Sequence, residues 1–443
     1  MTTPTHVTPD EASAQAYITG AEQNATRVPD LDGVTPRPIT RTGIIGGGTM
    51  GVGIAVAFAE AGLPVHIVER DAVSASAARE RVVAVYTRHL KRAMLSDEAR
   101  AARMGLVSVT DDWGVLRDCQ LVIEAAFEDI AVKVEIFRRL EGLAPPGAIL
   151  ATNTSYLDID AIAAATSRPR DVVGLHFFAP ANLMRLLEVV RAQHTAPDVL
   201  ATALALAVRL EKQPVVAGVC DGFIGNRIFA VYRRHAEYLV EDGASPDAVD
   251  AALEAYGFAM GPFAVSDLSG LDIAYAMRRR RDATRAAGER YVPVADRLHD
   301  AGRLGRKAGA GWYAYDAAGK KAIDPVTTAI VEDARVSKGI TPRSFTNDEI
   351  QRRALAVLAN EGAKVLAEGI ARCASDIDVA LVNGYGFPRR KGGPMWAADR
   401  QGLTAVLAEV ERAHLTGGTG SEPAPLLVEL AGTHSTFGAW RRE

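Results

Sequence analysis

The chain has 443 residues, of which 48% are hydrophobic, and a formal net charge of −4 at pH 7. This length and apolar content can bury a large core and predict two or three domains. The charge balance excludes a strongly basic surface for nucleic acid or an anionic membrane, and no apolar run is long enough to cross a bilayer. We therefore expect no nucleic-acid partner and no membrane partner.

The three cysteines, Cys119, Cys220 and Cys373, stand far apart in apolar surroundings. This spacing matches neither a metal site nor a redox motif, so we expect reduced thiols and no bound metal. The first twenty residues lack a signal core and presequence arginines, and the last four are not a peroxisomal address. Together these features predict a cytoplasmic location.

Residues 1–39 are polar and contain five prolines. This composition predicts a partly helical tail followed by a linker.

Residues 41–70 have the pattern strand, glycine turn, helix, strand. The turn from Gly46 to Gly51 fits G-x-G-x-x-G, directly after an apolar run and before an Ala-rich helical stretch. Gly46 permits the sharp turn, and Gly51 lets the helix pack closely on the strand. Gly48 lets the backbone approach a pyrophosphate at the helix N-terminus. The pattern predicts a dinucleotide site.

Glu69 ends the second strand of this pattern, about 20 positions after the turn. An acidic residue there accepts hydrogen bonds from the adenosine ribose and repels a 2′-phosphate, which predicts NAD rather than NADP. Arg70, the next residue, weakens that preference. Thr49 and Met50, inside the turn, are further expected cofactor contacts.

Apolar runs alternate with helical patterns up to residue 190. This alternation predicts a mostly parallel, doubly wound sheet, and so a Rossmann-type domain over residues 40–215. Residues 72–104 have the helical periodicity of a two-helix insertion. The expected strands are 42–45, 64–68, 121–127, 148–153, 172–177 and 186–190.

Beyond residue 196 helical patterns dominate, and the sequence repeats itself. The pattern Gly-Pro-x4-Asp-x2-Gly-Leu occurs at 261–271 and again at 393–403. We therefore predict an all-α C-terminal region of two repeated subdomains, 216–318 and 345–443, joined by a connector at 319–344. Within the first copy, the basic run 278–281 is expected to lie on a solvated helix face.

Four polar groups stand at strand ends or open the helical region, where ligands of open parallel sheets bind. They are Ser155, His176, Glu188 and Asn226. A histidine in an apolar strand is usually a satisfied core residue, but a carboxylate in the neighbouring apolar strand is costly to bury unpaired. A His176–Glu188 pair would form a strong general base, which the oxidation of an alcohol by NAD requires.

These residues and the stretches around them resemble the L-3-hydroxyacyl-CoA dehydrogenases, and more closely the dehydrogenase half of the multifunctional fatty-acid β-oxidation enzymes. The similarity covers residues 40–403, and its most specific blocks are GLHFF from Gly174 and DGFIGNR from Asp221. The hydratase domain of the multifunctional members has no counterpart in this chain.

The resemblance implies the NAD-dependent, reversible oxidation of (S)-3-hydroxyacyl-CoA to 3-ketoacyl-CoA. It makes His176 the general base, Glu188 the carboxylate that orients it, and Ser155 and Asn226 the groups that hydrogen-bond the substrate oxygen. An acyl-CoA substrate is the partner that follows.

The resemblance also implies roles near the cofactor and the CoA moiety. Glu128 and Lys133 would lie near the nicotinamide ribose, and Asn153 is a further expected cofactor contact. Three basic residues of the helical insertion are candidates for the CoA phosphates, although a solvated helix face explains them equally well: Arg88, Lys91 and Arg92.

Two other functions stay open at this point. One is a dehydrogenase of a free hydroxy acid on the same fold, and the other is a non-catalytic subunit descended from a β-oxidation multienzyme. For assembly, the two helical copies predict a monomer with an internal pseudo-dimer, and a homodimer is the alternative.

Overall fold

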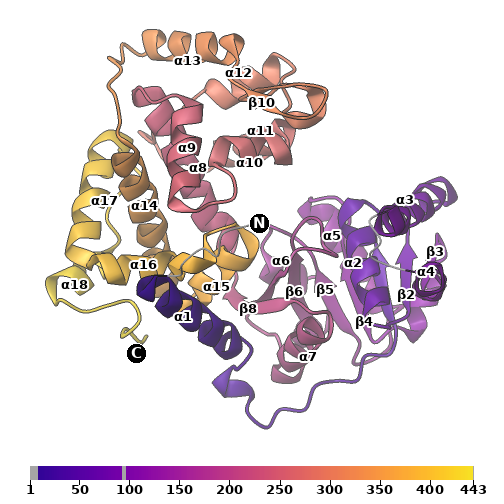
Figure 1. The fold of residues 1–443 in the computed structure, drawn as a ribbon. Coiled ribbons are helices and arrows are strands. Elements are labelled where there is room, and N and C mark those ends of the chain that lie inside the picture. The colour runs from indigo at the N-terminus through magenta and orange to yellow at the C-terminus, as the bar shows by residue number, and fades with distance from the viewer. Residues whose placement is uncertain (1–7, 92–95, 443) are drawn as a thin grey trace. The chain divides into compact units, whose positions relative to one another are not determined.

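The computed structural model describes residues 8–91 and 96–442, and the chain divides into two compact units. The sheet unit contains residues 18–226 and 369–372, and the helical unit contains the N-terminal segment up to Tyr17 with residues 227–368 and 373–443. A Rossmann-like sheet followed by a largely helical region confirms the predicted fold class (Figure 1).

The sheet unit is built on eight strands in the order β3-β2-β1-β4-β5-β6-β7-β8. Every neighbouring pair is parallel except β6 and β7, which are antiparallel. The strands are β1 (Thr42–Ile45), β2 (Val65–Val68), β3 (Val107–Thr110), β4 (Leu121–Glu124), β5 (Ile149–Thr152), β6 (Val172–Phe177), β7 (Leu186–Arg191) and β8 (Gln213–Gly218).

Helices flank this sheet, and α2 and α7 share its main hydrophobic core with β1, β2 and the later strands. The residues of β1, β2, β4 and β5 are mostly apolar and almost all buried, which is typical of strands covered on both faces. The helices are α2 (Thr49–Glu60), α3 (Ala72–Lys91), α4 (Asp97–Met104), α5 (Ile130–Glu141), α6 (Ile159–Ala163) and α7 (Pro197–Arg209), while α1 (Pro9–Ala25) crosses from the helical unit into this one.

The helical unit contains two series of four helices with matching lengths and order. The first is α8 (Gly225–Asp242), α9 (Pro246–Tyr256), α10 (Pro262–Ser269) and α11 (Leu271–Asp282). The second is α14 (Asn347–Ala367), α15 (Ala374–Gly384), α16 (Pro394–Gln401) and α17 (Leu403–Gly417), followed by α18 (Pro425–Gly432). Between them lie α12 (Val294–Asp300), the hairpin β9 (Ala314–Tyr315) and β10 (Lys321–Ala322), and α13 (Pro325–Ser337).

A buried aspartate has the same task in each series. Asp250 of α9 accepts hydrogen bonds from the amides of Phe263 and Ala264 at the start of α10. Asp378 of α15 accepts them from Met395 and Trp396 at the start of α16. The repeated sequence pattern therefore corresponds to a repeated way of attaching the third helix to the second.

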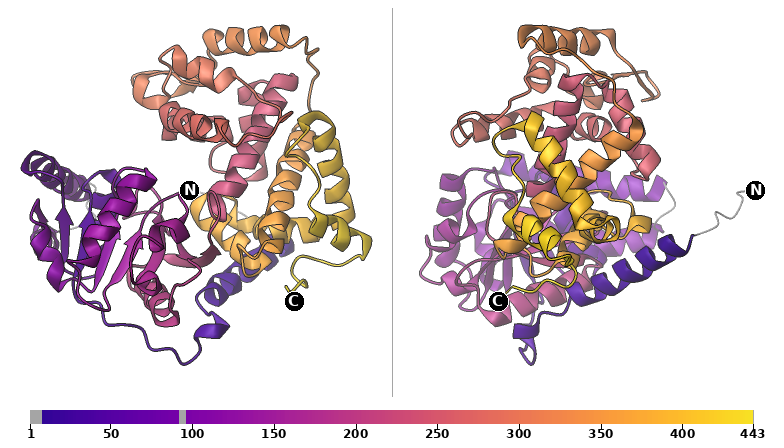
Figure 2. Two further views of the ribbon diagram at one scale, coloured as in Figure 1. Left: turned by 180° about the vertical axis from the view of Figure 1, so that it is seen from behind. Right: turned by 90° about the vertical axis from the view of Figure 1, so that its left-hand side faces the viewer.

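The two series pack on each other within the helical unit, with α14 lying against α9 (Figure 2). The rings of Phe258 and Phe387, which occupy matching positions in the two copies, meet edge to face at 5.4 Å. The amide of Gln351 in α14 donates to the carbonyl of Ala252 in α9 over 2.7 Å.

Some expected elements differ from those observed. The strands β3 and β8 are absent from the prediction, and the first strand after the helical insertion is β3 rather than the strand at Leu121. The region expected to be all helical contains the short β9–β10 hairpin.

Candidate active site

The glycine turn between β1 and α2 leaves no room for a side chain at Gly46 or Gly51, two glycines of the motif. Gly46 has a φ of 99°, and a Cβ there would lie 2.8 Å from the carbonyl oxygen of Ala125. A Cβ at Gly51 would lie 1.9 Å from the carbonyl oxygen of Gly46, because the helix starts directly against the strand end. Both positions need glycine for the reasons that the sequence pattern suggests.

Gly48, at the N-cap of α2, has open space around it. A Cβ there would meet no atom within 4 Å, and no side chain caps the helix end. The first amides of α2, including those of Thr49 and Met50, therefore end at an uncrowded surface that suits a pyrophosphate. The residues present fit the dinucleotide that the motif predicts.

Glu69 is held at the edge of this turn. Its Oε1 accepts a hydrogen bond of 2.7 Å from the amide of Gly47, where a ribose-binding carboxylate is expected. Arg70 is 84% exposed and its Nε pairs with Asp71 at 3.1 Å. Arg81, which the sequence analysis did not single out, donates to the carbonyl of Gly47 over 3.0 Å and brings a second cation to the turn.

His176 and Glu188 face each other across the antiparallel β6–β7 pair, where the register aligns them directly. The His176 Nδ1 lies 2.7 Å from Glu188 Oε2, and the two side chains are 4% and 0% exposed. Glu188 Oε1 accepts hydrogen bonds from the amides of Ile224 and Gly225, at 3.2 and 3.0 Å. The carboxylate thus has partners on both oxygens, and the imidazole is held by one nitrogen.

The turn before α8 supplies those two amides through an uncommon backbone. Gly222 has a φ of 80° and Phe223 a φ of 49°, a left-handed conformation that costs a non-glycine residue about 1–3 kcal/mol. The Phe223 ring is buried, and its centroid lies 5.6 Å from that of His176. Asn226 follows directly as the second residue of α8, so the turn sets its position relative to Glu188.

Ser155 and Asn153 follow β5, the strand next to β6. The side-chain oxygen of Asn153 accepts from the amide of Phe177 over 2.8 Å, which ties the end of β5 to the end of β6. The amide of Ser155 and the hydroxyl of Thr154 donate to Glu128 Oε1, at 2.8 and 2.6 Å. Glu128 therefore holds the loop that carries the Ser155 hydroxyl.

Lys133 lies between two carboxylates and is 1% exposed. Its Nζ is 2.8 Å from both oxygens of Glu124 and 3.2 Å from Glu128 Oε2. Burial raises the pKa of Glu128, but Lys133 and the hydrogen bonds from Thr154 and Ser155 outweigh it, so that pKa lies below its usual range.

Glu124 is the site residue that the sequence analysis missed. It is fully buried at the end of β4 and also accepts hydrogen bonds from the hydroxyl of Thr152 and the amide of Ala126. The available signal was one carboxylate inside an otherwise apolar strand, because such a residue is costly to bury without a cation.

Of the three candidate CoA contacts, the structure describes the side chain of one. Arg88 is exposed on α3. The side chain of Lys91 and the whole of Arg92 lie outside the described residues.

Neither a metal site nor a membrane span was expected. Within 8–91 and 96–442, no group of three or more His, Cys, Asp or Glu side chains could hold a metal ion. None of the helices in the same ranges is long and apolar enough to cross a membrane.

Two protein-family models match the chain. The model described as "3-hydroxyacyl-CoA dehydrogenase, NAD binding domain" matches residues 41–220, and "3-hydroxyacyl-CoA dehydrogenase, C-terminal domain" matches residues 222–315. The first range contains the glycine turn, which confirms NAD as the predicted cofactor.

Individual relatives agree with these models. The chain is 42% identical over 410 residues to the peroxisomal bifunctional enzyme of Danio rerio, covering 89% of this chain and 56% of the relative. Among solved structures, Mycobacterium tuberculosis FadB2 is 38% identical with a TM-score of 0.58, over 63% of this chain and all of FadB2. The dehydrogenase part of multifunctional enzyme 1 from Caenorhabditis elegans is 27% identical with a TM-score of 0.69, over 96% of this chain and all of that structure.

The chain spans somewhat more than half the length of the curated relatives that it matches. Those relatives are named peroxisomal or glyoxysomal proteins. Their names contradict the cytoplasmic location expected from the sequence, and that prediction is wrong.

Proposed function

We propose, because the chain belongs to the 3-hydroxyacyl-CoA dehydrogenase family, that it catalyses the NAD-dependent, reversible oxidation of (S)-3-hydroxyacyl-CoA to 3-ketoacyl-CoA. The observation that carries the proposal is the buried His176–Glu188 pair at the carboxyl end of β6, in the unit that contains the glycine turn.

His176 acts as the general base in this proposal. Glu188 accepts the Nδ1–H bond, which leaves Nε2 to take the proton of the substrate 3-hydroxyl. The carboxylate stabilises the imidazolium that forms, and the amides of Ile224 and Gly225 hold the carboxylate in place. Bound NAD supplies the hydride acceptor. A positioned base contributes about 10²–10⁴-fold to the rate.

Ser155 and Asn226 donate hydrogen bonds to the substrate oxygen as it gains negative charge. Donors aimed at developing charge stabilise the transition state more than the ground state, so their loss lowers kcat. Glu128 supports this role because its carboxylate binds the Ser155 amide and fixes the loop.

The remaining residues hold the cofactor. Gly46, Gly48 and Gly51 shape the turn for the pyrophosphate, with Thr49 and Met50 supplying amides of the helix N-terminus. Glu69 binds the adenosine ribose, and Arg70 lies beside it. Glu128, Lys133 and Asn153 lie toward the nicotinamide ribose.

The proposal is tested by following NADH oxidation with acetoacetyl-CoA as the substrate. We expect turnover with acetoacetyl-CoA and none with free acetoacetate, which separates the activity from that of a free hydroxy-acid dehydrogenase. His176→Gln and Glu188→Gln are expected to lower kcat at least about 100-fold while NADH affinity stays within about twofold, because both act on proton transfer. Normal kcat in either variant contradicts the assigned base.

Cofactor choice is measured in the same assay. NADH should give a higher kcat/KM than NADPH, because the Glu69 carboxylate would meet the 2′-phosphate with like charge. Equal values for the two cofactors would show that Arg70 or Arg81 compensates for that repulsion.

A further inference from the structure

A cavity lies within the helical unit and contains none of the residues assigned above. Its volume is about 600 Å³, a size that is typical of small-molecule sites. Residues of α8, the segment before α14, and helices α14, α16 and α17 form its walls. Apolar side chains cover part of the wall: Leu239, Phe345, Ala405, Ala408 and Ala413.

The charged residues of this cavity are mostly arginines. Four arginines and two glutamates line it: Arg343, Arg352, Arg353, Arg412, Glu349 and Glu409. Two aspartates outside the lining, Asp348 and Asp242, pair with Arg352 and Arg353. Arg352 and Arg412 both contact Glu409, at 2.9 and 2.6 Å. Arg412, which is 64% exposed at the rim, presents further guanidinium N–H groups that can bind an anion.

Arg353 is the innermost cation of the group and is only 8% exposed. Its Nη2 donates to Thr416 over 3.1 Å, and its Nη1 lies 3.6 Å from Asp242. Its Nε has no hydrogen-bond partner among the described residues. Burial, together with Arg290 and Arg343, lowers the pKa of Arg353 to about 10 against the opposing effect of Asp242. Arg353 is thus a buried cation that its own neighbours only partly compensate.

We propose that this cavity binds a small organic molecule that carries a phosphate group. A phosphate monoester is an anion at pH 7, which suits the buried and only partly compensated Arg353, and guanidinium groups bind phosphate oxygens in pairs. The apolar wall and the cavity volume accommodate an organic part beyond the phosphate. This assigns a ligand site to the helical unit, which does not contain the His176–Glu188 pair.

Phenyl phosphate is the probe for this site, with inorganic phosphate and phenol as its two halves. Isothermal titration is performed on the full chain saturated with NAD at pH 7.5, so that the glycine turn is already occupied. We expect one phenyl phosphate per chain, bound at least about tenfold more tightly than inorganic phosphate, and no measurable binding of phenol. The bound probe should also raise the Tm of the NAD-saturated chain.

Arg412→Gln is the informative variant because its side chain is 64% exposed at the rim, so its loss is compatible with folding. We expect this change to weaken phenyl phosphate at least about tenfold, as removal of a charge-assisted hydrogen bond does. Arg280→Gln, an exposed arginine of α11 outside the cavity, is the matched control and should leave the dissociation constant unchanged.

Two results would overturn the proposal: no binding of phenyl phosphate to the NAD-saturated chain, or the same affinity in Arg412→Gln and Arg280→Gln. Acetoacetyl-CoA reduction without the probe should be normal in both variants. A loss of that activity in Arg412→Gln would place the arginine in the catalytic machinery and contradict a separate site.

Discussion

Lys133 is the cation that lets the Glu124 carboxylate stay buried in the sheet unit, and it also reaches the partly exposed Glu128. It binds both oxygens of Glu124 at 2.8 Å and reaches Glu128 at 3.2 Å, and it is almost fully buried. Breaking a buried ion pair by removing one partner strands the other charge, whereas removing both charges avoids that penalty. Glu124 and Lys133 therefore behave as one unit in the energetics of the fold.

We predict that Lys133→Met lowers the free energy of unfolding by about 3–5 kcal/mol, because it leaves the Glu124 carboxylate buried without a cation. The double variant Glu124→Gln/Lys133→Met should recover more than half of that loss. Urea unfolding of the wild type, both single variants and the double variant completes the cycle. Additive losses in the double variant would show that the two residues act independently.

The sequence was sufficient to select the residues at the strand ends but not to arrange them. His176 and Glu188 each stand in an apolar strand, which predicted that they pair. The structure places them opposite each other in the β6–β7 register. The left-handed Phe223, whose turn aims two amides at Glu188, has no sequence signal because the conformation depends on tertiary packing. Glu124 was missed because the strand was expected to run from 121 to 127, which placed Glu124 in its middle, whereas β4 ends at Glu124.

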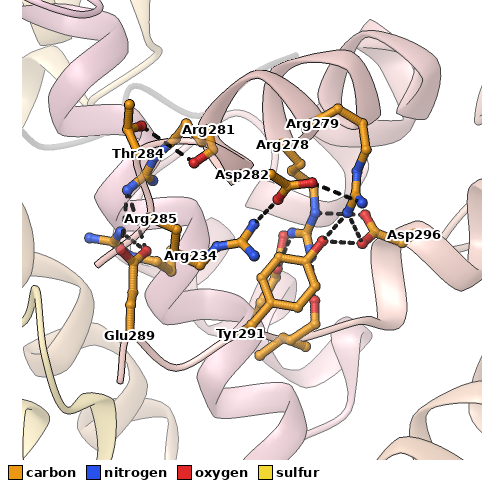
Figure 3. A network of polar contacts seen from close by, with 12 residues as sticks. Arg234, Arg278, Arg279, Arg281, Asp282, Thr284, Arg285, Glu289, Tyr291 and Asp296 are labelled. Carbon is orange, nitrogen blue, oxygen red and sulfur yellow. Dashed lines mark hydrogen bonds and ion pairs between the residues drawn. The ribbon is translucent and has the colours of Figure 1, made fainter. Parts of the chain in front are cut away.

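Among the elements, α11 owes its attachment to ion pairs more than to apolar contacts. Arg278 Nη1 lies 2.8 Å from Glu237 and its Nε lies 2.7 Å from Asp296, and all three side chains are at most 14% exposed. Figure 3 shows Arg278 and Arg279 converging on Asp296 beside Tyr291. The basic run 278–281 was expected to lie on a solvated helix face. Only part of it does, because the Arg278 side chain is largely buried.

Arg278→Gln is predicted to lower the free energy of unfolding by about 3 kcal/mol or more, since it leaves the buried Glu237 without its cation, although Asp296 still pairs with Arg279. Arg280→Gln, on the exposed side of the same helix, should change it by less than about 0.5 kcal/mol. Denaturant unfolding of the two variants in parallel gives the comparison, and equal effects would mean that the Arg278 pairs are energetically neutral.

The two strands that were not predicted from the sequence, β3 and β8, have weak sequence signals for strand formation. The strand β3 has four residues, VSVT, of which only Val109 is buried, so hydrophobic alternation is hard to recognise. The strand β8 contains Pro214 and ends at Gly218, two residues that are disfavoured inside strands. Pairing with β2 and with β7 supplies the stabilisation that local propensity does not.

A tyrosine hydroxyl binds the buried aspartate of each helical series, and helix α1 supplies the one for the second series. The Tyr17 hydroxyl donates to Asp378 over 2.7 Å, and the Tyr313 hydroxyl donates to Asp250 over 2.8 Å. Asp378 is fully buried, and that burial raises its pKa to about 8, although three hydrogen bonds oppose the effect. The folded chain therefore retains a proton on Asp378 at pH values where the unfolded chain has released it.

Stability should accordingly fall with rising pH because of this residue. The pKa of Asp378 in the folded chain lies above the unfolded value of 3.8. Its contribution to the free energy of unfolding is therefore complete below about pH 4 and is lost as the pH rises through about 8. We predict that the difference in unfolding free energy between the wild type and Asp378→Asn decreases from pH 5 to pH 8, by at most about 1.4 kcal/mol per pH unit. A pH-independent difference would show that Asp378 does not titrate in this range.

At the scale of the whole molecule, the second helical series replaces a partner that a single series would need. Helix α14 covers α9, and Arg227 of α8 binds Glu361 and Glu368 in or directly after α14, with its Nε 2.7 Å from Glu361. The ring cluster of Tyr256, Phe258 and Phe387 closes the contact with apolar area. A surface that an isolated first series would expose is thus covered within one chain.

This internal cover predicts a monomer of 47.1 kDa for the 443-residue chain, because the drive to dimerise through the first series is already met. Light scattering coupled to size exclusion at micromolar concentration measures the mass directly, and a stable mass near twice that of the chain would reject the prediction.

Deleting residues 345–443 tests whether the second series is what keeps the chain monomeric. The truncated chain should dimerise or aggregate and unfold at a lower Tm, because α9 and its aromatic rings lose their cover. A soluble, fully active and monomeric truncation would show that the second series covers nothing that the first needs.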